Sequence, residues 1–133
     1  VEFLGSIDIA LICHGNLPNQ EECQANYEKA EAAINVNGLS VISLCTEIVN
    51  NLRKERKGTL AIITSVAGER GRQPNFVYGA AKSMVSTYLQ GLRGSLLNEN
   101  IHIIDISSIN NIMIYYLIFE LTLTLPFFQH EIL

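Results

Sequence analysis

Two kinds of hydrophobic pattern alternate along this chain. Three short runs are almost entirely apolar, and they cover residues 6–12, 60–64 and 101–106. Continuous runs of this length are typical of strands that are buried on both faces of a sheet. Between them, apolar side chains recur every three or four residues over 41–52 and 77–96, which predicts amphipathic helices.

Residues 21–33 predict a further helix, because they are rich in Glu, Ala and Lys and begin with acidic residues. Strands that alternate with helices of this length predict an α/β fold, with a parallel sheet and helices on both of its faces. The helix at 41–52 is expected to end in the basic cluster 53–57, followed by Gly58. We interpret this cluster as a complement to the helix dipole rather than as a phosphate site.

The pattern changes after the third strand. Residues 107–133 contain only two charged side chains and no glycine. The apolar run 112–128 is interrupted by Glu120 and Pro126 and is at the short limit for crossing a bilayer. We therefore predict no stable membrane span, and we divide the chain into a domain portion, 1–106, and a divergent apolar tail.

Composition argues against several classes of protein. The net charge of −4 does not suit a nucleic-acid-binding surface, which normally carries a basic excess. The three cysteines, Cys13, Cys23 and Cys45, have no C-x-x-C spacing, so we predict neither a disulfide framework nor a metal site. Unpaired thiols are typical of reducing compartments, and we expect a cytoplasmic protein.

One segment carries the candidate chemistry. The strand at 60–64 brings Ser65 to its carboxyl end, where ligands bind in open α/β sheets. Thirteen residues later comes Tyr78, with Lys82 four residues beyond it, on one face of the predicted helix. An ammonium beside a phenol lowers the phenol's pKa, which allows proton exchange with a carbonyl or alcohol oxygen. Tyr-x-x-x-Lys alone is common on structural helices, and the preceding serine is what favours a catalytic role.

These residues resemble the active site of the short-chain dehydrogenase/reductases, an Asn-Ser-Tyr-Lys tetrad centred on Tyr-x-x-x-Lys. The resemblance covers roughly residues 6–106. It implies a partial doubly wound, Rossmann-like parallel sheet and hydride transfer between NAD(P)(H) and a carbonyl or alcohol substrate. The segment Ser-Val-Ala-Gly-Glu-Arg that begins at Ser65 is most similar to a subgroup that includes the keto-sugar reductase of decaprenylphosphoryl-arabinose synthesis.

The resemblance also implies a role for each residue. Tyr78 is the general acid/base, Lys82 lowers the pKa of Tyr78 and holds the nicotinamide ribose, and Ser65 orients the substrate oxygen. The asparagine has two candidates, Asn35 and Asn37. We favour Asn37, whose 28-residue lead over Ser65 fits the family pattern. A helix cap or turn is the structural alternative for either asparagine.

The chain departs from the family pattern in several places. Ile12-Cys13-His14-Gly15 stands where the family has Asn-Asn-Ala-Gly, so only Gly15 is kept for close approach of the cofactor. We interpret His14 as structural. The Gly-rich turn that holds the cofactor pyrophosphate has no counterpart, and Ser107-Ser108 replaces the family's Pro-Gly. We therefore expect a chain truncated at both ends that lacks the first βαβ units.

Two other functions compete with the oxidoreductase. One is a catalytically inactive fragment that retains only helix-mediated association, since family members usually form homo-oligomers through the helices that correspond to 41–57 and 76–97. The other is an RNA-binding module, because Gly68-Glu69-Arg70-Gly71 resembles a G-x-x-G loop. The negative net charge and the acidic residue inside this loop argue against RNA.

Overall fold

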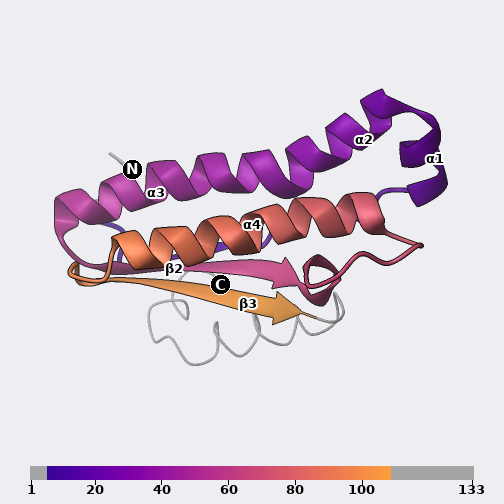
Figure 1. Ribbon diagram of the computed structural model, residues 1–133. Coiled ribbons are helices and arrows are strands. Elements are labelled where there is room, and N and C mark those ends of the chain that lie inside the picture. The colour runs from indigo at the N-terminus through magenta and orange to yellow at the C-terminus, as the bar shows by residue number, and fades with distance from the viewer. Residues whose placement is uncertain (1–5, 109–133) are drawn as a thin grey trace, which may run out of the picture.

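The computed structural model describes residues 6–108. In this range strands and helices alternate as the sequence predicts (Figure 1). The strands are β1 (Ile9–Ile12), β2 (Gly58–Ser65) and β3 (Ile101–Ser108). The helical elements are α1 (Gln20–Ala25), α2 (Tyr27–Ile34), the π-turn η1 (Asn35–Leu39), α3 (Ser40–Glu55), the 3-10 turn η2 (Val66–Gly68) and α4 (Phe76–Ser95).

The three strands form one parallel sheet in the order β1-β2-β3. Ile62 of β2 lies between its register partners Ile12 of β1 and Asp105 of β3. The strand order follows the chain without reversal, so two right-handed crossovers place their helices on the same side of the sheet. Figure 1 shows α3 and α4 together over one face. The parallel α/β fold is confirmed, whereas our expectation of helices on both faces is wrong for the described part.

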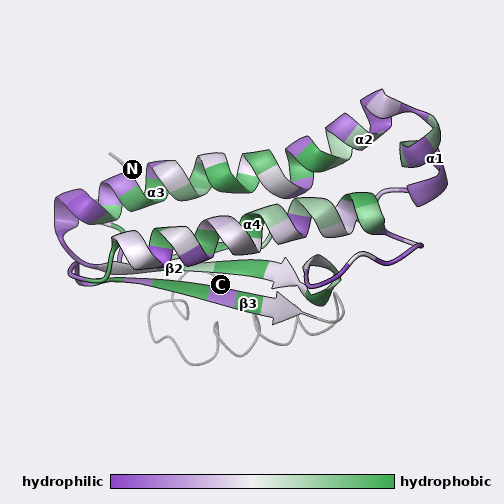
Figure 2. Cartoon of the chain, viewed as in Figure 1, coloured by the Kyte–Doolittle hydropathy of each residue, from purple (hydrophilic) through white to green (hydrophobic). Residues whose placement is uncertain are grey.

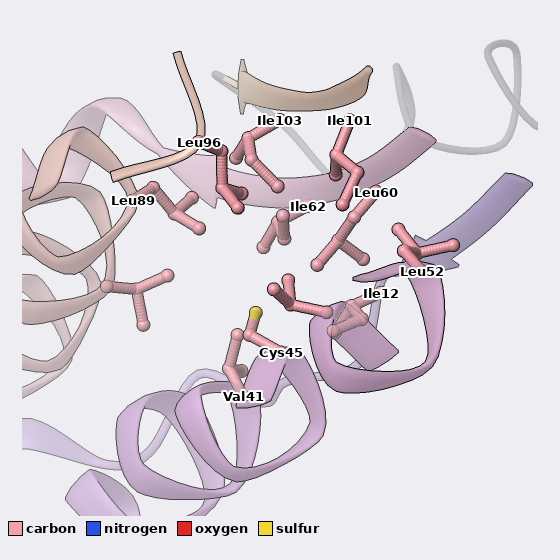
Figure 3. Packing of buried hydrophobic residues seen from close by; sticks show 12 residues of the cluster. Ile12, Val41, Cys45, Leu52, Leu60, Ile62, Leu89, Leu96, Ile101 and Ile103 are labelled. Carbon is pink, nitrogen blue, oxygen red and sulfur yellow. The ribbon is translucent and has the colours of Figure 1, made fainter. Parts of the chain in front are cut away.

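The core lies between this helical layer and the sheet. Figure 3 shows Leu60 and Ile62 of β2 pointing toward Cys45 of α3, and all three are fully buried. Leu89 of α4 closes the same cluster. Each large apolar side chain buried in this way stabilises the fold by about 1.5–3 kcal/mol. Figure 2 shows hydrophilic stretches at the C-terminal end of α3, on α1 and in the segment that joins β2 to α4.

The first predicted helix is divided at Asn26. This residue has extended backbone angles, ends α1, and begins α2 by accepting a hydrogen bond from the Glu28 backbone N–H at 2.8 Å. Asn19 caps α1 in the same way, through the Glu22 N–H at 3.1 Å. Asparagine favours such caps because its side-chain oxygen satisfies an unpaired N–H in the first turn. We predicted one continuous helix from the Glu, Ala and Lys content of this segment, which gives no indication of the break at Asn26.

The basic cluster at the end of α3 has a different geometry from the one we expected. Arg56, not the following glycine, adopts the left-handed conformation that ends the helix, with φ of 56°. Gly58 is instead the first residue of β2, with φ of 137°. Two cluster residues also form ion pairs, Arg53 with Glu99 at 3.1 Å and Lys57 with Asp8 at 2.9 Å. These exposed pairs, like the helix dipole, give the cluster structural roles.

Among the described residues, one continuous helical stretch, Tyr27–Glu55, has the length and composition of a membrane span. Its side chains include Val41 and Val49, which are buried in the core against the sheet. In the apolar part of this stretch 33% of the residues are buried in the structure, so packing against the sheet accounts for part of its apolar character. The run 112–128, discussed above as a possible span, lies outside the described residues. So does the predicted tail, 107–133, except for Ser107 and Ser108, which belong to β3.

The cysteines occupy different environments. Cys23 and Cys45 are buried, whereas Cys13 is exposed, and all three are free thiols. Burial raises the pKa of the Cys45 thiol to about 11, because desolvation disfavours the thiolate. Cys45 is therefore an inert packing residue, and no disulfide joins the described cysteines.

Candidate active site

A cavity of about 410 Å³ lies beside the carboxyl ends of β1 and β2. It is bordered by Ser65, Tyr78 and Lys82 and by the loop that contains Gly15. Ser65 is the last residue of β2 and Gly15 closely follows β1, so neighbouring parallel strands deliver both to the same edge of the sheet. Four of the five predicted site residues therefore border one cavity, and the fifth, Asn37, is hydrogen-bonded to Asn16 at its border.

Close packing of η2 against α4 brings Ser65 and Tyr78 together. A Cβ added to Gly79 would lie 2.6 Å from the carbonyl oxygen of Ala67, and one added to Gly68 would lie 2.8 Å from the backbone nitrogen of Ser83. Neither backbone contact leaves room for a side chain. The two glycines thus hold the turn after Ser65 directly on the first turns of α4, where Tyr78 and Lys82 lie.

Lys82 is almost completely buried, with 4% of its surface exposed. Its Nζ lies 3.4 Å from the carbonyl oxygen of Ile63, to which it donates a hydrogen bond, and 5.8 Å from the centre of the Tyr78 ring. Desolvation by burial lowers the pKa of Lys82 below its ordinary value. An ammonium donates three hydrogen bonds, and among residues 6–108 only the bond to Ile63 is identified, so Lys82 can also bind ligand hydroxyl groups.

Asn37 lies inside a continuous helix, not at its cap. It is fully buried in η1, where the N–H of Ser40 bonds to the carbonyl of Asn35, five residues earlier. The Asn37 side chain donates from Nδ2 to the carbonyl oxygen of Ala33 at 3.0 Å. In an α-helix, the backbone N–H of residue 37 would pair with that carbonyl. The cap or turn interpretation of this asparagine is therefore wrong, and π-turns of this kind are frequent at functional sites.

Asn16 is a site residue that the sequence analysis missed. Its backbone N–H donates to Oδ1 of Asn37 at 3.0 Å, and its own Oδ1 accepts from Nδ2 of Asn37 at 2.9 Å. The preceding Gly15 is equally constrained, because a Cβ there would lie 2.8 Å from Oδ1 of Asn37 and 3.4 Å from Nζ of Lys82. The only available signal was the turn cluster Asn16-Leu17-Pro18-Asn19, which gives no indication of a partner 21 residues away.

Gln20 is a second residue that sequence analysis missed. Its Oε1 accepts a hydrogen bond from the backbone N–H of Val77 at 3.0 Å, at the start of α4 and next to Tyr78. Gln20 is the first residue of α1 and is buried. This bond therefore ties the segment after β1 to the helix that carries Tyr78. Helix N-termini have unpaired N–H groups that require such acceptors.

His14 has a hydrogen-bonding partner, as we expected of a structural histidine. It is exposed, and its Nε2 lies 2.7 Å from Oγ of Ser40. Among residues 6–108, no group of three or more His, Cys, Asp or Glu side chains is arranged to hold a metal ion.

The sequence model of the short chain dehydrogenase family matches residues 1–110. The chain belongs to this family. An uncharacterized oxidoreductase of Mycobacterium tuberculosis strain H37Rv is 29% identical over 100 residues, which cover 75% of this chain and 40% of that protein. This short-chain dehydrogenase segment thus spans well under half the length of that relative.

Two solved structures share the fold. Levodione reductase superimposes with a TM-score of 0.74 at 21% identity, covering 80% of this chain and 42% of that one. The NADH-dependent reductase A1-R′, solved in complex with NAD, gives a TM-score of 0.71 at 19% identity, with coverages of 83% and 48%. At these identities the likeness establishes the Rossmann-type fold, and the chemistry must be argued from the site.

Proposed function

We propose that this chain carries the proton-transfer half of an NAD(P)-dependent oxidoreductase that acts on a carbonyl or alcohol. The observation that supports this most directly is the meeting of Ser65, Tyr78 and Lys82 at one cavity, with Lys82 almost fully buried. A surface helix that only happened to contain Tyr-x-x-x-Lys would have no reason to bury the lysine, because burying an ammonium is costly.

The cofactor fits Gly15 and Lys82, which border the cavity next to each other. Gly15 brings backbone to the cavity border at a position where a side chain would collide with Asn37. The Lys82 ammonium can donate to the hydroxyls of a ribose, as the family resemblance implies. When bound, NAD(P)H supplies a hydride to the carbonyl carbon of the substrate, and the oxidised form removes one from the alcohol carbon.

The side chains themselves handle the proton. Tyr78 donates its phenolic proton to the substrate oxygen during reduction and recovers it during oxidation. Lys82 stabilises the phenolate that remains, because a positive charge nearby favours the ionised phenol. Ser65 binds the same oxygen through its hydroxyl. Asn37, held in η1, supports the backbone beside Lys82 and is proposed to maintain the path by which the proton is replaced.

The finer expectations also remain proposals. A keto-sugar reductase activity of the decaprenylphosphoryl type is supported by the Ser-Val-Ala-Gly-Glu-Arg segment. A homo-oligomer is supported by family membership and by apolar side chains that remain exposed on the long helix, such as Leu39 and Leu44. A cytoplasmic location is supported by the free cysteines.

Fluorescence titration of the 133-residue chain with NADH and NADPH tests whether this chain alone holds the cofactor. We expect weak binding, because the printed sequence contains no Gly-rich pyrophosphate turn. Saturable binding with hydride transfer to a carbonyl would establish the oxidoreductase in the chain itself. The absence of both would support the alternative, a segment that only associates through its helices.

A further inference from the structure

The cavity beside Ser65 and Tyr78 has a basic border in an acidic protein. The whole chain has a net charge of −4. Among residues 6–108, however, the charged side chains that border this cavity are Lys82 and Arg72, with His14 as a third basic group, and no Asp or Glu borders it. Such a local excess of one sign attracts ligands of the opposite charge.

Arg72 differs from the arginines that have structural partners. Arg53 pairs with Glu99 at 3.1 Å, and Nε of Arg93 donates to the carbonyl oxygen of Ile103 at 3.2 Å. Within the described part of the chain, no hydrogen bond or ion pair is identified for the Arg72 guanidinium. The backbone of Arg72 is nevertheless anchored, because its carbonyl accepts the N–H of Asn75 at 3.1 Å. A free guanidinium is thus presented from a fixed turn.

The position of Arg72 in the chain indicates which ligand it binds. Arg72 lies in the segment that joins β2 to α4, between Ser65 at the end of β2 and Tyr78 in the first turn of α4, and all three border the cavity. Gly15, the residue proposed to approach the cofactor through its backbone, lies instead in the loop after β1. We infer that Arg72 binds an anionic group, a carboxylate or a phosphate, on the carbonyl substrate. A guanidinium binds either group in a bidentate manner. The inference rests on the proposed function only in calling this ligand a substrate.

Arg70 provides a matched control. It lies in the same segment, carries the same charge and is exposed, but it does not border the cavity. Arg72→Gln and Arg70→Gln therefore change the net charge equally and differ only in position. Both side chains are exposed, so both variants are expected to fold.

The experiment is an NMR titration of the 133-residue chain with 4-oxopentanoate and with its methyl ester, which keeps the ketone but removes the charge. The expected result is saturable shifts of the Arg72 Nε–H and of the Ser65 and Tyr78 amides with the acid, and at least about tenfold weaker binding of the ester. Arg72→Gln should weaken binding of the acid by about tenfold, whereas Arg70→Gln should leave it unchanged.

Several outcomes would overturn the inference. Equal binding of acid and ester, equal loss in the two variants, or no saturable binding of the acid would each do so. A parallel titration with NADPH and NADH tests whether Arg72 instead binds a phosphate group of the cofactor. If Arg72→Gln weakens binding of the nucleotides but not binding of the acid, the guanidinium binds the cofactor and the inference is wrong. None of these readouts requires turnover, so an inactive chain would contradict the proposed function without affecting this result.

Discussion

Two groups of residues at the cavity are held together in different ways. In the first group, Ser65, Tyr78 and Lys82 lie within 18 residues of chain, and a strand end followed by one helix is enough to bring them together. In the second group, Asn16 is joined to Asn37, 21 residues away, by one hydrogen bond from its backbone N–H and one to its side-chain oxygen. The first group follows from helical periodicity, whereas the second depends on hydrogen bonds that no local sequence pattern indicates. Their contributions to chemistry and to stability should therefore separate on mutation.

The largest effect on activity is expected from Tyr78→Phe, measured in a catalytically active form of the protein. Removing the phenolic hydroxyl should reduce turnover by about 10²–10⁴-fold, the usual contribution of a general acid/base, with cofactor affinity nearly unchanged. Steady-state kinetics and nucleotide titration measure the two quantities. Tyr88→Phe is the control, because Tyr88 lies on the same helix but its hydroxyl is 3.4 Å from Thr46, outside the cavity. Equal losses in both variants would refute the assignment of Tyr78.

The second prediction tests the packing of η2 against α4, which brings Ser65 close to Tyr78 and Lys82. Alanine ordinarily stabilises a helix relative to glycine by about 1 kcal/mol. Gly79→Ala should instead destabilise the protein by about 1–3 kcal/mol, because the new methyl group meets the Ala67 carbonyl. Gly91→Ala, in the same helix with nothing within 4 Å, should stabilise it. Urea denaturation gives both values, and a stabilised Gly79→Ala variant would show that the close contact is unimportant.

The third prediction tests the hydrogen bond between the side chains of Asn16 and Asn37. Asn16→Ala removes one of the two acceptors of Nδ2 of Asn37 and leaves the Ala33 carbonyl oxygen as the other. An unsatisfied buried N–H costs about 1–3 kcal/mol. Asn16→Asp retains an acceptor oxygen and should recover part of this loss. Asn98→Ala, at an exposed position, should change stability by less than about 0.5 kcal/mol.

A double-mutant cycle makes the third test specific. If Asn16 acts through Asn37, the losses from Asn16→Ala and Asn37→Ala should not add fully, since both variants remove the bond between Nδ2 of Asn37 and Oδ1 of Asn16. Additive losses in chemical denaturation would show that the two amides stabilise the protein independently.

The smallest expected effect is a pH dependence of stability that arises from Lys82. Burial lowers its pKa in the folded state, so the unfolded chain binds this proton more tightly. The free energy of unfolding should therefore gain a contribution from Lys82 as the pH rises from the lowered value toward 10.5. Lys82→Met should remove that part of the slope. An identical slope in both proteins, measured by denaturation across alkaline pH, would show that Lys82 is well solvated.

Much of the fold could be predicted because each strand and helix has its own hydrophobic period. The runs ending at Thr64 and Ile106 were confirmed as strands, each slightly longer than predicted. The break at Asn26 was not predictable in this way, because a cap depends on one side-chain bond and leaves the periodicity intact. The side on which the helices lie was also missed, since it depends on strand order, and strand order is a property of the whole sheet.

The candidate site was likewise predictable where it depends on local spacing and not where it depends on contacts between distant segments. Asn37 was selected over Asn35 by its spacing from Ser65, and the structure places it in a buried π-turn. Its partner Asn16 and the contact from Gln20 to α4 were missed, because both join segments that are distant in sequence. The tetrad roles themselves stay predictions, to be tested by the substitutions above.

The sequence by itself determined the α/β alternation and the spacing of Ser65, Tyr78 and Lys82. These features depend on backbone periods and on residues close together in the chain. Only the tertiary structure decided that Lys82 is buried, that Asn16 holds Asn37, and that Arg72 borders the cavity without a structural partner among the described residues. Burial and pairing are set by what neighbouring strands and helices bring together, so they become visible only once the chain is folded.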